Sequence, residues 1–187
     1  MFVLASASPR RLALLEQIGV APDQVCAPEV DEAPQEDETA RALALRLAVS
    51  KAHAVEHARA VVLGADTVVA CGRRILPKTE MESEARACLR LLSGRAHMVV
   101  TAVAVKDDAG RVRTRLGAAR VKFARLSEEE VESYIACGEW RGKAGGYAIQ
   151  GRAGRFISSV QGSYTAVVGL PLQETAFLLR QAGVVVP

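Results

Sequence analysis

The sequence has no apolar run of the ~20 residues that a membrane-spanning helix needs, no run of like charge and no low-complexity segment. Its start lacks the basic residues and the long apolar stretch of a signal peptide. The net charge of +3 is mild, which argues against a dedicated nucleic-acid binder. We therefore expect a cytoplasmic protein that neither enters membranes nor has nucleic acid as its partner.

Several common catalytic motifs are also missing. The four scattered cysteines form no C-x-x-C pair and have no histidine at ligand spacing, so free thiols are expected rather than a zinc site. His53 and His57 share a helix face but lack an H-E-x-x-H setting, which favours a surface position. No serine stands in a G-x-S-x-G elbow, and the glycine-rich segment at 142–154 is neither a Walker loop nor a G-x-G-x-x-G turn.

The periodicity of what remains predicts one α/β domain with a mixed sheet, spanning residues 1–187. Half of the residues are apolar, which is ample for a core. The patterns predict strands at 2–5, 24–27, 61–70, 97–106, 112–123, 155–160 and 164–169, a hairpin at 71–76, and helices at 9–18, 39–58, 82–92, 127–137 and 171–183.

The start of the first predicted helix carries an unusual pair of cations. Ser8 suits the N-cap and Pro9 the first helical position. Arg10 and Arg11 follow in the first turn, where the helix dipole disfavours positive charge by a few tenths of a kcal/mol or more. Either a phosphate binds at this helix terminus and to the two guanidinium groups, or both side chains simply point into solvent.

Asp66 is the most conspicuous single residue, because it lies in the otherwise apolar stretch VVLGADTVVA. A buried carboxylate needs a partner, a metal or a raised pKa, so we interpret Asp66 as functional. The alternative is that it ends its strand and caps a backbone amide. Lys51 continues the apolar stripe of its helix after Leu47, where a lone lysine usually extends its amine to solvent.

The acidic loop PEVDEAPQEDE, at 28–38, contains Asp31 and Glu32, which are either solvated or able to hold a hard cation such as Mg²⁺. Cations near the ends of predicted elements, together with a few acids, are the make-up of a metal-assisted phosphate site. The cations are Arg10, Arg11, Lys51 and Lys78, and the acids are Asp66 with Glu32 or Asp31.

Six segments in the same order resemble the Maf family of nucleoside triphosphate pyrophosphatases: LASASPRRLALLEQIG, VDE, LRLAVSKA, LGADTVV, GKAGGYAIQG and GSYTAVVGLPL. The resemblance covers nearly the whole chain. It implies an elongated mixed sheet flanked by helices, with two lobes around a cleft, similar to inosine triphosphate pyrophosphatases. It also implies hydrolysis of a nucleoside triphosphate to the monophosphate and pyrophosphate with a divalent metal, Mg²⁺ or Mn²⁺, and a possible homodimer.

The resemblance also implies roles for individual residues. Asp66 would accept the proton from water and, with Glu32, would contact the metal. The residues expected to contact the substrate are Ser8, Arg10, Arg11, Lys51 and Lys78, and those expected to read its identity are Arg10, Thr67 and Gln150.

The form YAIQG resembles the branch of the family that hydrolyses dTTP and UTP. The alternatives are the sister branch acting on 7-methyl-GTP and, in another class, a non-hydrolytic nucleotide- or RNA-binding regulator of cell division. One departure stands out: the family commonly has Lys-Pro-x-Asp where this chain has Lys78-Thr79-Glu80-Met81. A metal contact from the position of Met81 is therefore in doubt.

Overall fold

The computed structural model describes residues 1–57 and 59–187, and its centre is a seven-stranded mixed sheet. The strands run in the order β2-β1-β3-β6-β7-β9, with β4 paired to β3. The first three of these pair in parallel and the others antiparallel. The bounds are β1 Phe2–Ala5, β2 Gln24–Cys26, β3 Val61–Cys71, β4 Arg74–Leu76, β6 Ala96–Lys106, β7 Val112–Phe123 and β9 Ile157–Gly162.

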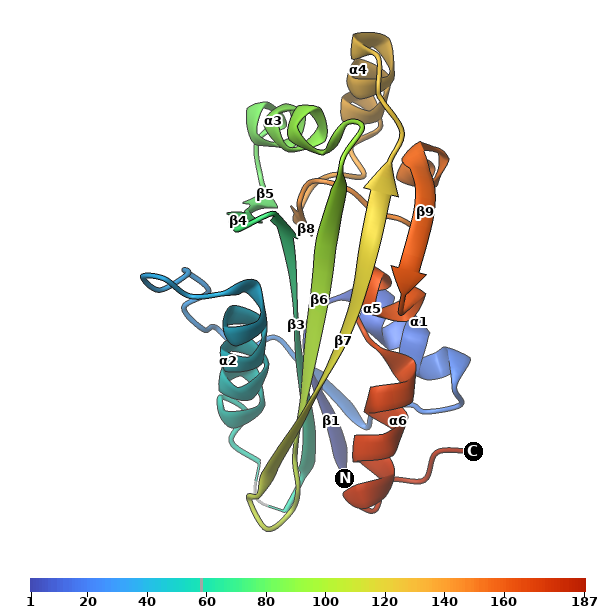
Figure 1. Cartoon of the computed structure of the whole chain (residues 1–187). Coiled ribbons are helices and arrows are strands. Elements are labelled where there is room, and N and C mark those ends of the chain that lie inside the picture. The colour runs from blue at the N-terminus through green and yellow to red at the C-terminus, as the bar shows by residue number, and fades with distance from the viewer. Residues whose placement is uncertain (58) are drawn as a thin grey trace.

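Three long strands connect the two ends of the molecule. β3, β6 and β7 run side by side along almost its full length (Figure 1). β3 and β6 pair in a register that places Asp66 opposite Ala102 and Thr67 opposite Thr101. Because successive side chains of a strand point to opposite faces, the side chains of Asp66 and Thr67 lie on different faces of the sheet.

Helices cover the lower part of the sheet on both faces. α2 (Ala40–His53) packs on one face, and α1 (Pro9–Gln17), α5 (Tyr164–Val168) and α6 (Leu172–Gln181) lie on the other (Figure 1). Each face has its own apolar cluster, with Leu43 and Leu47 of α2 in one. Leu14 and Leu15 of α1 belong to the other, together with α6.

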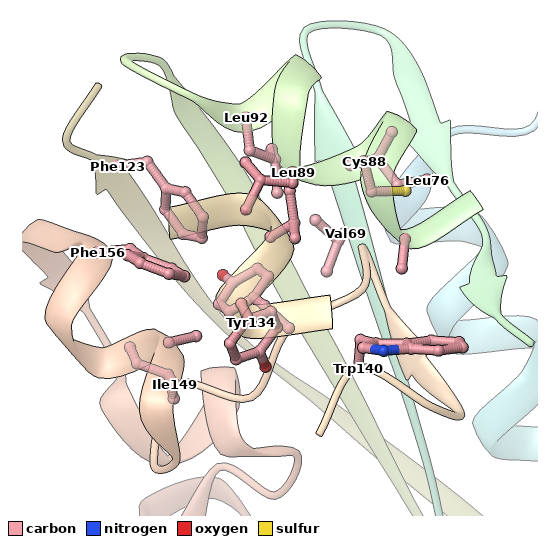
Figure 2. Packing of buried hydrophobic residues seen from close by; sticks show 14 of the residues in the cluster. Val69, Leu76, Cys88, Leu89, Leu92, Phe123, Tyr134, Trp140, Ile149 and Phe156 are labelled. Carbon is pink, nitrogen blue, oxygen red and sulfur yellow. The ribbon is translucent and has the colours of Figure 1, made fainter. Parts of the chain in front are cut away.

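The far end of the sheet carries a second, smaller lobe. α3 (Glu82–Leu92) and α4 (Glu128–Cys137) pack there over a third apolar cluster (Figure 1). Figure 2 shows this cluster, in which Tyr134, Phe123 and Phe156 pack with tilted or edge-on rings. A short 3₁₀ helix, Arg152–Phe156, completes the lobe.

A separate two-stranded sheet borders the gap between the lobes. β5 (Lys78–Thr79) pairs antiparallel with β8 (Lys143–Ala144). Gly145 and Gly146 follow β8 at φ +69° and +70°. A Cβ at Gly145 would lie 2.9 Å from a Val69 methyl group, so only glycine lets this turn approach β3.

The predicted α/β architecture is confirmed, but one segment was assigned the wrong type and several boundaries were wrong. The segment expected as a strand at 164–169 is the helix α5, because the Ser163 hydroxyl accepts a hydrogen bond from the Ala166 amide and caps it. The strand expected from Arg155 begins at Ile157, after the 3₁₀ turn. α2 ends at His53, and the predicted helix end, Ala58, lies outside the described residues.

Among the described helices, none combines the length and the apolar character needed to cross a membrane.

Candidate active site

A cleft of about 310 Å³ lies between the lobes. The loop from β1 to α1, the acidic loop, α2, β3, β5, the glycine-rich loop and the end of α5 all contribute to its walls. The charged residues lining it are five cations, Arg10, Arg11, Lys51, Lys78 and Lys143, and two acids, Glu32 and Glu80. An excess of cations in a cleft attracts and concentrates polyanionic ligands.

The close packing of α2 on β3 fixes one wall. Gly64 has no side chain, and a Cβ there would lie only 2.3 Å from the Ala48 carbonyl oxygen. The helix therefore rests directly on the strand backbone. Asp66 lies two residues after Gly64 on the same face, and Lys51 lies one helical turn after Ala48. This spacing brings the Lys51 amine within 2.6 Å of Asp66 Oδ1.

The Lys51–Asp66 pair is buried, with both residues under one-tenth exposed. This contradicts the two non-functional interpretations from the sequence. Lys51 does not extend to solvent, and Asp66 lies inside β3 rather than capping its end. Removing one partner of such a pair would leave an uncompensated buried charge. Asp66 Oδ2 has no hydrogen-bond partner among the described residues, so it is available for chemistry.

Glu32 joins this pair to the second lysine. One carboxylate oxygen lies 2.6 Å from the Lys51 amine, and the other accepts a hydrogen bond from Lys78. Partial burial raises the pKa of Glu32, but the hydrogen bonds from Lys51 and Lys78 outweigh it and hold the pKa at about 2. Glu32 is therefore ionised at neutral pH. Asp31 is exposed and accepts a hydrogen bond from the Ala33 amide, so Glu32 is the acid of the pair that enters the cleft.

A smaller cavity of about 210 Å³ adjoins the cleft, and Asp66 lines this one. The two cavities share Glu32, Thr67, Lys78 and Ala144. The Glu32–Lys78 pair thus lies where the cleft meets the space around Asp66.

Arg11 is buried, which contradicts the alternative that both arginines of α1 simply point into solvent. Its Nε donates to the Gly169 carbonyl at 2.8 Å, and its Nη1 donates to the Ser6 hydroxyl at 2.9 Å. Its Nη2 donates to the Thr67 hydroxyl at 3.3 Å. Burial lowers the pKa of Arg11, although nearby Asp66 opposes this. All three acceptors are neutral, so Arg11 ties three segments together and still brings its positive charge to the cleft.

Arg10 and Lys143 face the cleft from opposite lobes. Burial lowers the pKa of Arg10, and burial followed by repulsion from Arg10 lowers the pKa of Lys143. Neither forms a salt bridge with an acid among the described residues. Lys143 lies in the glycine-rich segment and was not predicted as a site residue. Its position in β8, opposite Thr79, is visible only in the fold.

Ser8 occupies the predicted N-cap position of α1, but its side chain makes no capping hydrogen bond. The Ser8 amide instead donates to the Ser6 hydroxyl. With Pro9 next, few backbone N–H groups remain at this terminus for an anion, so the expected backbone cradle is only partly available. The positive charge of the cleft comes mainly from side chains.

Thr67 lies beside Asp66 but faces the Arg11 side of the sheet. Its hydroxyl lies 2.8 Å from that of Thr101, which donates to the Ala166 carbonyl at 2.7 Å. The single Thr101 proton is thereby used, so Thr67 donates to Thr101 and accepts from Arg11. Thr67 can therefore accept a hydrogen bond from a ligand but has no proton left to donate to one.

The glycine-rich loop brings Gln150 to the wall of the cleft. The Gln150 side chain is exposed and makes no hydrogen bond among the described residues. The backbone just before it is anchored in the small lobe: the buried Tyr134 hydroxyl accepts from the Ala148 amide at 3.1 Å. Burial raises the pKa of Tyr134 to about 12, so this hydroxyl stays protonated at neutral pH.

His97 supports the same loop, and sequence reasoning found no role for it. Its Nε2 lies 2.7 Å from the Tyr147 hydroxyl, and both residues are buried. Burial lowers the pKa of His97 to about 4, so the ring is neutral. Tyr147 also lines the cleft. Thr79, which replaces the usual proline, adds a hydrogen bond from its buried hydroxyl to the Trp140 carbonyl at 2.8 Å.

Met81 lies at the N-cap of α3 with an exposed side chain, outside the cleft lining. The amides of Glu80 and Met81 both donate to the Glu84 carboxylate, at 2.9 and 3.1 Å. Glu84 thus satisfies the start of the helix without an aspartate at position 81. The departure from the family pattern changes a helix cap and removes no residue from the wall of the cleft.

The carboxylates near the cleft fit a hard cation in type and number. Among residues 1–57 and 59–187, no group of three or more His, Cys, Asp or Glu side chains is placed to hold a metal. Asp66 and Glu32 nonetheless converge, because an oxygen of each lies 2.6 Å from the same Lys51 nitrogen. Mg²⁺ is usually held by one or two carboxylates, with water and substrate phosphates completing the coordination.

The fold is shared with a protein of known structure. Over 97% of this chain and 98% of the other, the structure is similar to that of a HAM1 protein from Coxiella burnetii, with a TM-score of 0.54 at 15% identity. This likeness concerns the fold alone and agrees with the predicted architecture.

The sequence comparisons show the family to which the chain belongs. Residues 1–182 match the family model described as Maf-like protein, and the chain belongs to that family. It is 59% identical to a dTTP/UTP pyrophosphatase of Caulobacter vibrioides, covering 97% of this chain and 95% of the relative. It is 56% identical to a protein of the same name from Chelativorans sp., covering 97% and 90%.

Proposed function

We propose that this protein is a dTTP/UTP pyrophosphatase, which hydrolyses the bond between the α- and β-phosphates of these nucleotides and releases the monophosphate and pyrophosphate. The observation that carries the proposal is the cation-lined cleft that adjoins a buried carboxylate with one unpaired oxygen. The names of the relatives at 59% and 56% identity support it. The substrates are free nucleotides, so the proposal includes a cytoplasmic location. It also keeps the homodimer that the family resemblance implies.

The triphosphate would lie along the cations of the cleft. Arg10 and Lys143 lack acidic partners among the described residues, and Arg11 has only neutral acceptors, so their charges are available to phosphate oxygens. Lys51 and Lys78 are paired with Glu32, so phosphates must compete with that carboxylate for them. The Ser8 hydroxyl lies among these groups and can donate one more hydrogen bond.

Asp66 is the proposed proton acceptor. Its Oδ1 is held by Lys51, which leaves Oδ2 to orient a water molecule and take its proton. Glu32 and Asp66 are the proposed ligands of a divalent cation, Mg²⁺ or Mn²⁺, which when bound would neutralise charge on the phosphates. The pairing of Glu32 with Lys51 and Lys78 supports this, because a carboxylate that gives up these lysines to phosphates needs another cation.

Gln150 is the proposed reader of the base. A neutral amide both donates and accepts, which matches the adjacent carbonyl and N–H groups of thymine and uracil. Cytosine reverses part of this pattern, and a mismatch would leave buried polar groups unpaired. Arg10 also lines the cleft, and Thr67 can contribute an acceptor.

A substrate panel tests the proposal. Purified protein with Mg²⁺ is expected to release pyrophosphate from dTTP and UTP well above dCTP, dATP, dGTP and 7-methyl-GTP. Asp66→Asn keeps the shape but removes the base, and the expected loss of rate is about 10²–10⁴-fold. A preference for 7-methyl-GTP would move the protein to the sister branch. Tight nucleotide binding without hydrolysis would favour the regulatory alternative.

A further inference from the structure

The acidic loop between β2 and α2 contains no strand or α-helix, yet it delivers Glu32 to two lysines of the cleft. Most residues around Glu32 are exposed, among them Asp31 and Ala33. A carboxylate on such a segment needs something to fix its backbone, because loops without packed side chains are mobile.

Arg46 of α2 makes the contacts that cross-link this loop. Its Nε and Nη2 donate to the two carboxylate oxygens of Glu38, both at 2.8 Å. Nη2 also donates to the Ala33 carbonyl at 2.9 Å, and Nη1 donates to the Asp31 carbonyl at 3.4 Å. These two carbonyls belong to the residues directly before and after Glu32.

Glu38 closes the other limb of the loop. Its side chain is only 7% exposed, and its Oε2 accepts a hydrogen bond from the Gln35 amide at 3.0 Å. The Glu38 amide donates in return to the Gln35 carbonyl at 3.1 Å. Arg46 therefore joins both limbs of the loop through one guanidinium group, a geometry that the fork of Arg supplies and the point charge of Lys does not.

We propose that Arg46 is a positioning residue for Glu32. The inference rests on the proposed function for its effect on catalysis. Arg46 lies five residues before Lys51 on α2, so one helix holds both the backbone around Glu32 and the amine that its side chain contacts. Misplacing a supporting contact of this kind typically lowers metal affinity or activity by about 10- to 100-fold.

The alternative without a functional role is that Arg46 and Glu38 form an ordinary surface ion pair. Such pairs contribute little to stability, and many contribute nothing measurable. The two interpretations differ in whether the kinetic effect of removing Arg46 depends on Glu32. A surface pair predicts near wild-type kinetics for Arg46→Ala, whereas a positioning residue predicts a loss that depends on the presence of Glu32.

A double-mutant cycle separates them. Arg46→Ala is expected to lower kcat/KM for dTTP by about 10- to 100-fold and to raise the Mg²⁺ concentration that gives half-maximal rate. Arg46→Lys should recover only part of the loss, because it cannot bind both Glu38 oxygens and the carbonyls. In a Glu32→Gln background, Arg46→Ala should have little further effect. Arg41 is exposed on the same helix and forms no salt bridge among the described residues, so Arg41→Ala is the matched control.

Hydrogen–deuterium exchange gives a readout without substrate or metal. Amides of residues 29–38 should exchange faster in Arg46→Ala than in wild type or Arg41→Ala, while those of β3 stay protected. Unchanged exchange, or equal kinetic effects of Arg46→Ala with and without Glu32, would overturn the positioning role. If the wild-type protein hydrolyses no triphosphate, the proposed function fails, whereas the exchange data still decide whether Arg46 fixes the loop.

Discussion

Gly64→Ala tests whether the spacing between α2 and β3 sets the geometry of the site. The added Cβ would lie 2.3 Å from the Ala48 carbonyl oxygen and 2.8 Å from the Ala52 amide nitrogen. Ordinary contacts of this kind begin at 3.4 Å, so the helix must retreat by about 1 Å, and Lys51 moves with it away from Asp66. Overpacking of this size costs about 1–3 kcal/mol, and a displacement of about 1 Å at a catalytic group can lower the rate by about 100-fold.

The assay pairs urea unfolding with dTTP kinetics. Gly64→Ala is expected to lower the free energy of unfolding and kcat together. Gly72→Ala is the control: it places alanine at φ +61° in the turn between β3 and β4, where a Cβ meets nothing within 4 Å. It should lose stability by backbone strain but keep its rate. A Gly64→Ala protein with wild-type turnover would refute the argument that this contact positions Lys51.

Three further predictions concern single groups. Arg11→Ala should lower the free energy of unfolding by about 1.5–3 kcal/mol, because Ser6, Thr67 and Gly169 lose a charged donor. Arg10→Ala should have the melting temperature of the wild type. Both variants should lose about 10- to 100-fold in kcat/KM. An unchanged melting temperature for Arg11→Ala would contradict its tethering role. Because the pKa of His97 falls from 6.5 to about 4 on folding, stability should be full above about pH 6.5 and fall by about 3 kcal/mol as the pH drops to 4. In urea titrations across this range His97→Gln should show a flatter profile, and an equal slope would rule out His97 as the source. Gln150→Glu should weaken use of dTTP and UTP in a substrate panel, because a carboxylate cannot donate to a base carbonyl; an unchanged panel would remove Gln150 from base recognition.

The parts of the fold that sequence reasoning predicted are those whose local pattern agrees with their tertiary setting. β3, β6 and β7 have long apolar runs, and α4 has a complete capping box with Ser127 and Glu130. The segment at 164–169 failed because its apolar, β-branched composition resembles a strand. Its helical state depends on the Ser163 cap, which short-range periodicity does not reveal.

The candidate site was predictable as a set of residue types but not as a set of pairs. Asp66 stood out because a carboxylate interrupts an apolar strand, whereas its partner lies 15 residues earlier on a helix. The close approach of α2 to Gly64, at Ala48 and Ala52, fixes which turn of the helix faces Asp66, and no local pattern reveals it. The His97–Tyr147 contact joins residues 50 positions apart and leaves no local signal.

The cations of the cleft differ in how their charge is compensated, and this difference suggests an order of binding. Arg11 is held by neutral oxygens, so its charge acts on a phosphate from the start. Lys51 and Lys78 are matched by Glu32, and Lys51 is also matched by Asp66. The two lysines hold the pKa of Glu32 at about 2, so this carboxylate is ionised at neutral pH. A triphosphate can take these lysines only if the carboxylate gains another positive partner, since an unpaired charge in a partly buried site is costly. Electrostatics thus ties phosphate binding at the lysines to cation binding at Glu32 and Asp66, which is the physical reason to propose that hydrolysis requires a divalent metal.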